Sequence, residues 1–409
     1  MKRILFTTLL ILSFIGLKTY AHDFEVNGVY YNIVADKKVE VTFKGEDTDS
    51  HANEYIGSIK IPSSVSYYGT KYTVIAIGND AFYDCEKITS VKIPNSVIAI
   101  GNYAFYGCKK ATSIEIPKSI TNIGRSAFMF TNLYSIKIPK SVINIGVGAF
   151  NSCDKLTTII VEKGNRKYDS RDNCNAIIET ASNKLIAGCL NTIIPNSVNE
   201  IGENAFWGVS GLTSISIPSS VTSIGDRAFF SCDFTSIIIP NTVLYIGKHA
   251  FEYTGLTRIK IPKSVAMIGV GAFESCSSLE SIIVEKGNDR YDSRDNCNAI
   301  IETASNKLIA GCRNTKIPNA VTEIGEYAFD GQYYLPSIII PNSVKKIGEN
   351  AFWYCTKLTS ITIPYSVTEI QKNAFGGCEN LEEVTILNAD TKYHPEAFDK
   401  NTKIIRSTK

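Results

Sequence analysis

Cysteine is the residue type with the clearest potential for chemistry in this chain. The sequence of 409 residues contains eleven cysteines, and seven of them follow a recurring Ala-Phe-x-x-Cys pattern. Regularly spaced thiolates can form a ladder of metal ligands or disulfides, but a small buried residue can also recur for packing alone. We favour packing, because Thr131, Gly208 and Gly331 occupy or neighbour the same place in other copies. The seven cysteines are Cys85, Cys108, Cys153, Cys232, Cys276, Cys355 and Cys378.

The other four cysteines flank two copies of one segment. Cys174 and Cys189 enclose a stretch that is typical of a β-hairpin, and Cys297 and Cys312 enclose an identical stretch. Folding the hairpin at its centre places the two cysteines almost opposite one another, within reach of a disulfide. We therefore consider Cys174–Cys189 and Cys297–Cys312 as candidate disulfides, and buried free thiols explain the same positions. An odd total leaves at least one thiol without an intramolecular partner.

The sequence gives little support for a calcium site or for catalytic motifs. The run Asp169-Ser170-Arg171-Asp172-Asn173 offers oxygen ligands for calcium, but it lacks the order and the glycine of a calcium loop, so we favour a hydrogen-bonded turn. The motifs H-E-x-x-H, G-x-S-x-G, C-x-x-C and a phosphate-binding glycine loop are missing. The four histidines, His22, His51, His249 and His394, are scattered. The sequence therefore predicts no catalytic residue, no metal site and no cofactor.

Composition narrows the class of protein. Hydrophobic residues make up 44% of the chain and charged residues 20%, which excludes a disordered polypeptide and suffices for a large core. The formal net charge of +2 gives no general reason to expect nucleic-acid binding.

A short repeat organises most of the chain. Ala-Phe recurs every 22 or 23 residues, except for two gaps of 56, and residues 169–189 recur unchanged 123 residues later. The unit can be written I-x-I-P-x-S-V-x-x-I-G-x-x-A-F-x-x-C-x-x-L-x-S, as in residues 215–236. The first residues of the unit alternate between apolar and polar, which predicts a short strand. The proline ends that strand, because it has no N–H to donate to the hydrogen-bond ladder of a sheet. A glycine follows at a corner, and the Ala-Phe segment has the spacing of one short helical turn.

Units of this size cannot bury an apolar face alone, so they must stack. We predict an α/β repeat solenoid of the leucine-rich-repeat type, a right-handed coil of about fourteen turns and roughly 65 Å with capped ends. One long parallel β-sheet would line one side, and short helical turns the other.

The repeat resembles a known family. The units at residues 88–108 (ITSVKIPNSVIAIGNYAFYGC) and 212–232 (LTSISIPSSVTSIGDRAFFSC) resemble the BspA-like bacterial surface-antigen leucine-rich-repeat family, and the resemblance covers residues 56–398. It implies a secreted or surface-displayed repeat protein, often linked to adhesion to host matrix proteins or other microbes. The family has no shared catalytic residues to transfer.

The remaining segments predict the boundaries. Residues 1–21 combine Lys2 and Arg3, an apolar run and a small residue at Ala21, which is typical of a secretory signal peptide. No later run is long enough to span a membrane, so we expect an exported chain without a transmembrane segment. Residues 22–55 form an N-terminal β cap, 56–398 the solenoid with hairpin insertions near 165–190 and 288–313, and 399–409 a C-terminal tail.

The best binding candidates lie two residues before each proline equivalent. Alternation places this column on the outer face of the strands, and it contains one acid, Glu115, in fourteen positions. An exposed apolar strip often marks an interaction site, although isoleucine also simply suits a pleated surface. The candidates are Ile160, Ile193, Ile238, Ile283, Ile339, Lys137, Lys260 and Lys316.

We therefore expect a non-enzymatic protein at the cell surface or outside the cell, which binds an extracellular protein or glycan in adhesion or recognition. A structural component of the envelope or matrix, with no specific ligand, is the first alternative. A carbohydrate-active enzyme of the parallel β-helix kind is the second, and the scarcity of acids in the column opposes it.

Overall fold

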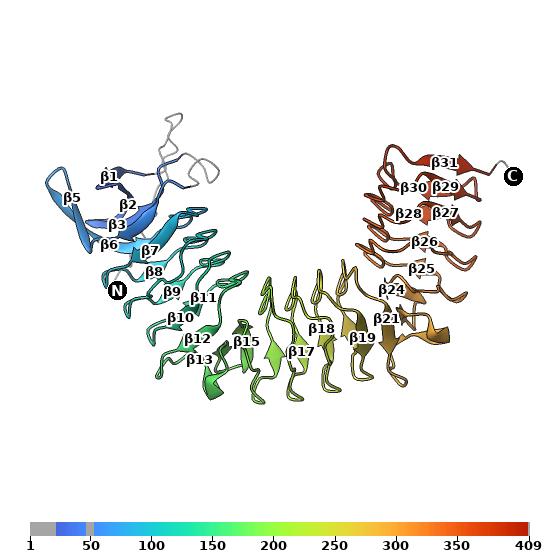
Figure 1. Ribbon diagram of the computed structural model, residues 1–409, viewed down its shortest axis with the longest axis horizontal. Coiled ribbons are helices and arrows are strands. Elements are labelled where there is room, and N and C mark those ends of the chain that lie inside the picture. The colour runs from blue at the N-terminus through green and yellow to red at the C-terminus, as the bar shows by residue number, and fades with distance from the viewer. Residues whose placement is uncertain (1–21, 46–52, 408–409) are drawn as a thin grey trace, which may run out of the picture.

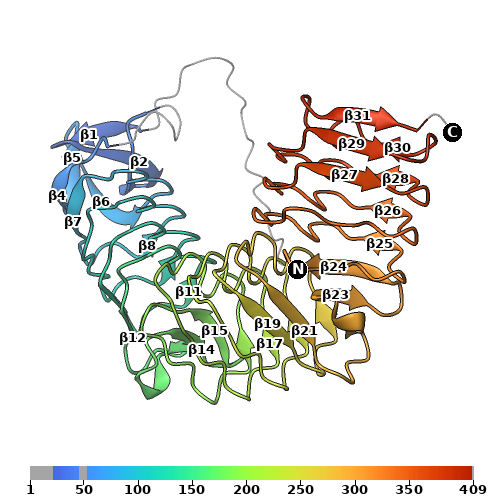
Figure 2. The same cartoon turned by 45° about the vertical axis from the view of Figure 1, so that its right-hand side comes forward.

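The computed structural model describes residues 22–45 and 53–407, which form stacked coils that bend into an arch (Figures 1 and 2). The architecture is a β-solenoid of about fourteen turns, as the repeat predicts. The two tips of the arch carry the N-terminal strands and the last strand, β31 (Lys403–Arg406). The predicted signal peptide at residues 1–21 lies outside the described residues.

The first tip is a small antiparallel sheet. Strands β1 (Phe24–Val26), β2 (Val29–Ala35) and β3 (Lys38–Thr42) follow one another, and β3 pairs in parallel with β6 (Thr70–Ile77) of the first coil. A hairpin of β5 (Ser64–Tyr67) and β6 widens this coil. The sheet thereby pairs one edge of the first coil, whose backbone groups need partners.

Each regular coil contributes two extended segments to the stack. The I-x-I-P segments form β4 (Gly57–Lys60), β7 (Ile88–Lys92), β10 (Ser135–Ile138), β12 (Thr158–Val161), β19 (Arg258–Ile261), β21 (Ser281–Val284), β27 (Ser360–Ile363) and β29 (Glu383–Ile386). The segments before the I-G step form β8 (Ala99–Ile100), β9 (Asn122–Ile123), β11 (Asn144–Ile145), β16 (Glu200–Ile201), β17 (Ser223–Ile224), β18 (Tyr245–Ile246), β20 (Met267–Ile268), β25 (Glu323–Ile324), β26 (Lys346–Ile347), β28 (Glu369–Ile370) and β30 (Lys392–Tyr393). We call the two sides of the stack the I-x-I-P face and the I-G face.

The prediction of one long parallel sheet is wrong. The short strands of the I-G face join strands of the N-terminal cap or of the hairpins in three sheets of eight, seven and seven strands. On the I-x-I-P face the strands of the described residues pair only as β4-β7, β10-β12, β19-β21 and β27-β29-β31. Glycine explains the closer contact on the I-G face: a Cβ built on Gly124 would lie 2.4 Å from the backbone nitrogen of Asn102 in the preceding coil. Coils can approach one another at this corner only because the side chain is absent.

The predicted helical turns are also absent, so the fold is an all-β solenoid rather than an α/β one. In the described residues, helix is limited to two three-residue 3₁₀ turns, η1 (Arg171–Asn173) and η2 (Arg294–Asn296). The residue before Ala-Phe takes a left-handed conformation in every repeat except the last, for example Tyr103 (φ 55°) and Asn204 (φ 57°), which an α-helix does not allow. The Phe82 N–H donates instead to the Ala104 carbonyl of the next coil at 2.8 Å.

Two hairpins interrupt the regular stack. Strands β13 (Tyr168–Asp169), β14 (Ile177–Glu179) and β15 (Lys184–Ala187) form the first insertion, and β22 (Tyr291–Asp292), β23 (Ala299–Glu302) and β24 (Lys307–Gly311) form the second. The buried phenylalanines stack in three ladders of four, with centroid spacings of 5.1–5.4 Å from Phe82 to Phe150. The other ladders run from Phe206 to Phe273 and from Phe329 to Phe398. The insertions therefore divide one solenoid into three successive stretches of core.

Candidate functional site

The I-x-I-P face presents the candidate binding residues because of its alternation. In β10 and β12 the two isoleucine or valine positions are buried and the residue between them is exposed. The parallel register places Lys137 beside Ile160, and the duplicated block places Lys260 beside Ile283 in the same way. Two pairs of the predicted residues are thus neighbours on the surface.

All five predicted isoleucines are exposed. Ile238 is 84% and Ile339 85% exposed, and Ile160, the least exposed, is still 48% accessible. Large aliphatic side chains at such exposure are costly to hydrate, and burial by a partner would recover about 25 cal/mol per Å². The apolar column that the alternation predicts is therefore present at the surface.

Two of the three predicted lysines of this face form ion pairs with glutamates. Lys137 Nζ lies 3.4 Å from a carboxylate oxygen of Glu162, and Lys260 Nζ lies 2.9 Å from one of Glu285. The hydrogen bond from Lys260 holds the pKa of Glu285 below its usual value. Lys316 is exposed on the same face. A partner of this face would meet two ion pairs, which contribute little stability in water.

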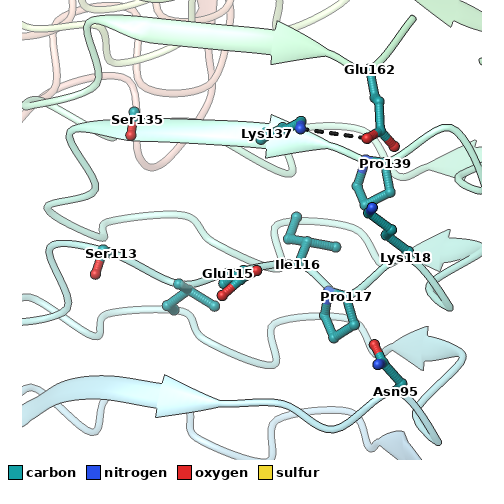
Figure 3. A pocket seen from close by; sticks show the side chains of 11 residues that line it. Asn95, Ser113, Glu115, Ile116, Pro117, Lys118, Ser135, Lys137, Pro139 and Glu162 are labelled. Atoms are coloured by element: carbon teal, nitrogen blue, oxygen red, sulfur yellow. Dashed lines mark ion pairs between the residues drawn. The ribbon is translucent and has the colours of Figure 1, made fainter.

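Three hollows lie where neighbouring I-x-I-P segments are not paired as strands. The first has a volume of about 540 Å³ and lies between the segments around Glu115 and Lys137, with Glu162 at its side (Figure 3). The second, of about 480 Å³, is lined by Ile193 and Ser216, and the third, of about 580 Å³, by Lys316 and Ile339. The second and third occupy equivalent places, 123 residues apart, in the duplicated blocks. The interruptions of the sheet thus create recesses beside the exposed isoleucines.

The four hairpin cysteines are buried free thiols in this structure. Cys189 Sγ donates to the Asn175 carbonyl at 3.2 Å, and Cys174 Sγ lies 3.7 Å from the Ala176 carbonyl. Cys312 and Cys297 repeat this arrangement in the second hairpin. In this structure each thiol is directed at a different backbone carbonyl, and the two candidate disulfides stay a prediction.

The acidic run before each hairpin is a closed turn. The Arg171 guanidinium donates through Nε and Nη2 to the two carboxylate oxygens of Asp169, at 2.7 and 2.5 Å. Hydrogen bonds from Arg171 lower the pKa of Asp169 although partial burial opposes them. The Asp169 carboxylate, which a calcium ion would need as a ligand, is therefore already bound by the Arg171 guanidinium.

Sequence reasoning missed one cluster. His249, Glu252 and Glu274 offer ligand atoms that lie within 4.8 Å of one another, on the turns that contain the repeat phenylalanines Phe251 and Phe273. The histidines look scattered along the chain, but the column one residue after each repeat Phe reads Glu252, Glu274 and Asp330 in succession. Reading that column would have revealed the acidic side of the cluster.

Repeated I-x-I-P strands, glycine corners and a stacked phenylalanine core define a leucine-rich-repeat solenoid. The model of the BspA type leucine rich repeat region matches residues 49–178, 184–300 and 299–408, which is most of the chain. The chain therefore belongs to the BspA-type leucine-rich-repeat family, as its repeat predicts. No curated protein matches it significantly.

This chain is similar to several solved structures, and one of them has the same kind of fold. A leucine-rich repeat protein from Eubacterium ventriosum is 20% identical with a TM-score of 0.51, over 92% of this chain and 97% of that one. One from Bacteroides ovatus is 26% identical, with a TM-score of 0.44 over 95% and 100% of the two chains. A leucine rich cell surface protein from Faecalibacterium prausnitzii is 26% identical, with a TM-score of 0.45 over 94% and 95%.

Within residues 22–45 and 53–407, no helix has the length and apolar character needed to cross a membrane.

Proposed function

We propose that this chain is an exported, non-catalytic recognition protein that binds an extracellular protein or glycan through its I-x-I-P face, in adhesion at a cell surface. The observation that carries the proposal is the column of exposed isoleucines, Ile238 and Ile339 above all, of which Ile339 lines a recess of about 580 Å³. Repeat proteins use such extended faces for partners. Membership of the BspA-type family supports a recognition role of this class.

The chemistry of the face favours binding over turnover. In the largest N-terminal recess the one acid of the column, Glu115, lies with Lys137, and the carboxylate of Glu162 is engaged by that lysine. Glycoside hydrolysis uses a pair of carboxylic groups with different protonation states on opposite sides of the bond. Of the two carboxylates that line the recess, that of Glu162 is paired with Lys137, which favours holding a carbohydrate there over cleaving it.

Export is part of the same proposal. It rests on the basic start, apolar run and small residue at Ala21 in residues 1–21. Eleven buried thiols are compatible with an oxidising compartment, since burial limits their contact with oxidants.

A binding array tests recognition against a structural role without a ligand. Purified protein that begins at residue 22 is applied to extracellular-matrix proteins and glycans, and the concentration is raised to the micromolar range. We expect saturable binding to a small subset of the ligands. Uniform weak binding, or none, would contradict recognition and favour a structural component; release of glycan fragments would instead indicate an enzyme.

A further inference from the structure

The turns after the repeat phenylalanines carry two different surfaces. In several coils the next residue is aromatic and stacks on its neighbour, as Tyr83 does on Tyr106 with ring centroids 4.7 Å apart. After three repeat phenylalanines of the second block, Phe251, Phe273 and Phe329, the same position is acidic: Glu252, Glu274 and Asp330. The second insertion brings the last two together, because the Ser275 N–H donates to the Asp330 carbonyl at 3.0 Å.

His249 projects into this acidic group. Its Nδ1 lies 2.9 Å from Oε2 of Glu252 and 2.9 Å from Oε2 of Glu274. Metal–ligand bonds of about 2.1 Å place neighbouring ligand atoms about 3 Å apart, so this spacing fits three ligands of one ion. Within residues 22–45 and 53–407, it is the one such group of three or more His, Cys, Asp or Glu side chains.

The ligand atoms are buried and poorly satisfied. The side chain of Glu252 is only 10% exposed, and the Nδ1 of His249 and the Oε2 of Glu274 have no access to solvent and no hydrogen bond of good geometry. One N–H cannot point at two carboxylates at once, whereas a cation at the centre can interact with both. His249 Nδ1 lies at ion-pair distance from both carboxylates but has no well-oriented hydrogen bond, so a cation at the centre would satisfy these buried atoms better.

The electrostatics of this cluster also favour a bound cation. Asp330 is 5% exposed, and burial together with Glu274 raises the pKa of Asp330 to about 8. The cause is an excess of buried negative charge, which positive charge relieves.

The first block is an internal comparison. At positions 123 residues earlier, the residues corresponding to His249, Glu252, Glu274 and Asp330 are Ser126, Met129, Asn151 and Trp207. The fold of the two blocks is the same there, since the Ser152 N–H donates to the Trp207 carbonyl at 3.0 Å as Ser275 does to Asp330. The coil therefore does not need an imidazole and carboxylates to fold at this place.

We propose that His249 Nδ1 and the Oε2 atoms of Glu252 and Glu274 form a binding site for a divalent transition-metal ion of the Zn²⁺ or Mn²⁺ type. One imidazole with two carboxylates suits these ions, and water completes the coordination. Binding displaces the proton from His249 Nδ1, and Asp330 lies beyond the ligands as a neighbouring acid. The ion joins two consecutive coils next to the second insertion, where the phenylalanine ladder is interrupted.

Titration with metal ions tests this site. Untagged protein that begins at residue 22 is stripped with a chelator, kept under reducing conditions and titrated with ZnCl₂ or MnCl₂ by calorimetry, and its thermal unfolding is followed with and without each ion. We expect one ion per chain and a higher unfolding midpoint with the ion present, because the ion binds only the folded chain. Mn²⁺ serves beside Zn²⁺ because it prefers oxygen and nitrogen ligands to thiolates.

The internal comparison supplies the variants. His249→Ser with Glu274→Asn introduces the residues of the first block, which that block accommodates, and we expect the ion and its stabilisation to be lost. Ser126→Ala with Asn151→Ser changes the matching positions of the first block and keeps the ion. Glu274→Gln, nearly equal in shape, replaces the double variant if circular dichroism shows that the latter is unfolded. Failure of the starting protein to bind either ion, or equally tight binding by the folded His249 or Glu274 variants, would overturn the proposal.

Discussion

At the scale of single residues, the recurring cysteine is a packing and hydrogen-bonding residue. Cys232 Sγ donates to the Phe206 carbonyl of the preceding coil at 3.2 Å, and Cys276 Sγ donates to that of Phe251 at 3.1 Å. Where threonine replaces cysteine, the Thr254 hydroxyl donates instead to the Phe251 carbonyl of its own coil, at 2.8 Å. The sequence predicts a small buried residue here, but the acceptor of each cysteine lies about one repeat away along the chain and only the stacking of coils identifies it.

The reactivity of the thiols follows from this burial. Desolvation raises the pKa of Cys153 and of Cys276 to about 12, so almost no thiolate is present at pH 8. We expect folded, reduced protein to react with a thiol reagent such as dithionitrobenzoate far more slowly than protein in guanidinium, where eleven thiols react. Rapid labelling of the folded protein would contradict the buried arrangement.

The same assay decides the two candidate disulfides. Protein isolated from an oxidising compartment would show seven reactive thiols in guanidinium if Cys174–Cys189 and Cys297–Cys312 form, because four of the eleven are then consumed. Eleven thiols would show that the hairpins keep the free cysteines of this structure. A double variant, Cys174→Ser with Cys189→Ser, assigns any difference to the first hairpin.

At the scale of elements, the Ala-Phe turn shows where sequence patterns mislead. The spacing of Ala205, Phe206 and Leu212 suits a helical turn, and all three side chains are buried as that pattern requires. The backbone differs, because Asn204 is left-handed and the Phe206 N–H donates to the Ala228 carbonyl of the next coil at 2.8 Å. Side-chain spacing fixes what is buried, but it cannot tell hydrogen bonds within a segment from those between coils.

The hairpins fit into the stack by replacing the repeat phenylalanine with glycine. The Gly188 N–H donates to the Ala205 carbonyl at 2.8 Å, as a repeat phenylalanine would, and the Phe206 ring covers it. A Cβ on Gly188 would lie 2.1 Å from Cε1 of Phe206, and Gly311 has the same relation to Phe329. These glycines let the next ladder of phenylalanines begin directly beyond each hairpin.

Gly188→Ala tests this element. We expect a loss of about 1 to 3 kcal/mol in the free energy of unfolding, since the methyl group must displace a buried ring. Gly376→Ala is the matched control, because a Cβ there meets no atom closer than 3.6 Å. Urea unfolding followed by circular dichroism compares the two, and equal midpoints for both variants would refute the proposed contact.

At the scale of the whole molecule, the duplication determines the order of coils and hairpins, and the bending of the stack determines where recesses lie on its surface. The period of 123 residues predicts two hairpins, about fourteen coils and the exposed isoleucine column. It does not predict which I-x-I-P segments separate, because that depends on how tightly the coils approach at the glycine corner. The recesses at Glu115, Ile193 and Lys316 therefore depend on the bending of the stack and could not be predicted from the repeat pattern alone.

The central claim, that the I-x-I-P face binds a ligand, is tested most directly by the affinity of matched surface variants for the strongest array ligand. One variant carries Ile238→Ser, Ile283→Ser and Ile339→Ser, and the other carries Ile143→Ser, Leu244→Ser and Met267→Ser, three exposed apolar residues in or beside the I-G segments. We expect the first variant to bind at least about tenfold more weakly, as the loss of buried apolar area requires, and the second to bind like the starting protein. Unchanged affinity in the first variant, with loss in the second, would contradict the account and move the binding site to the I-G face.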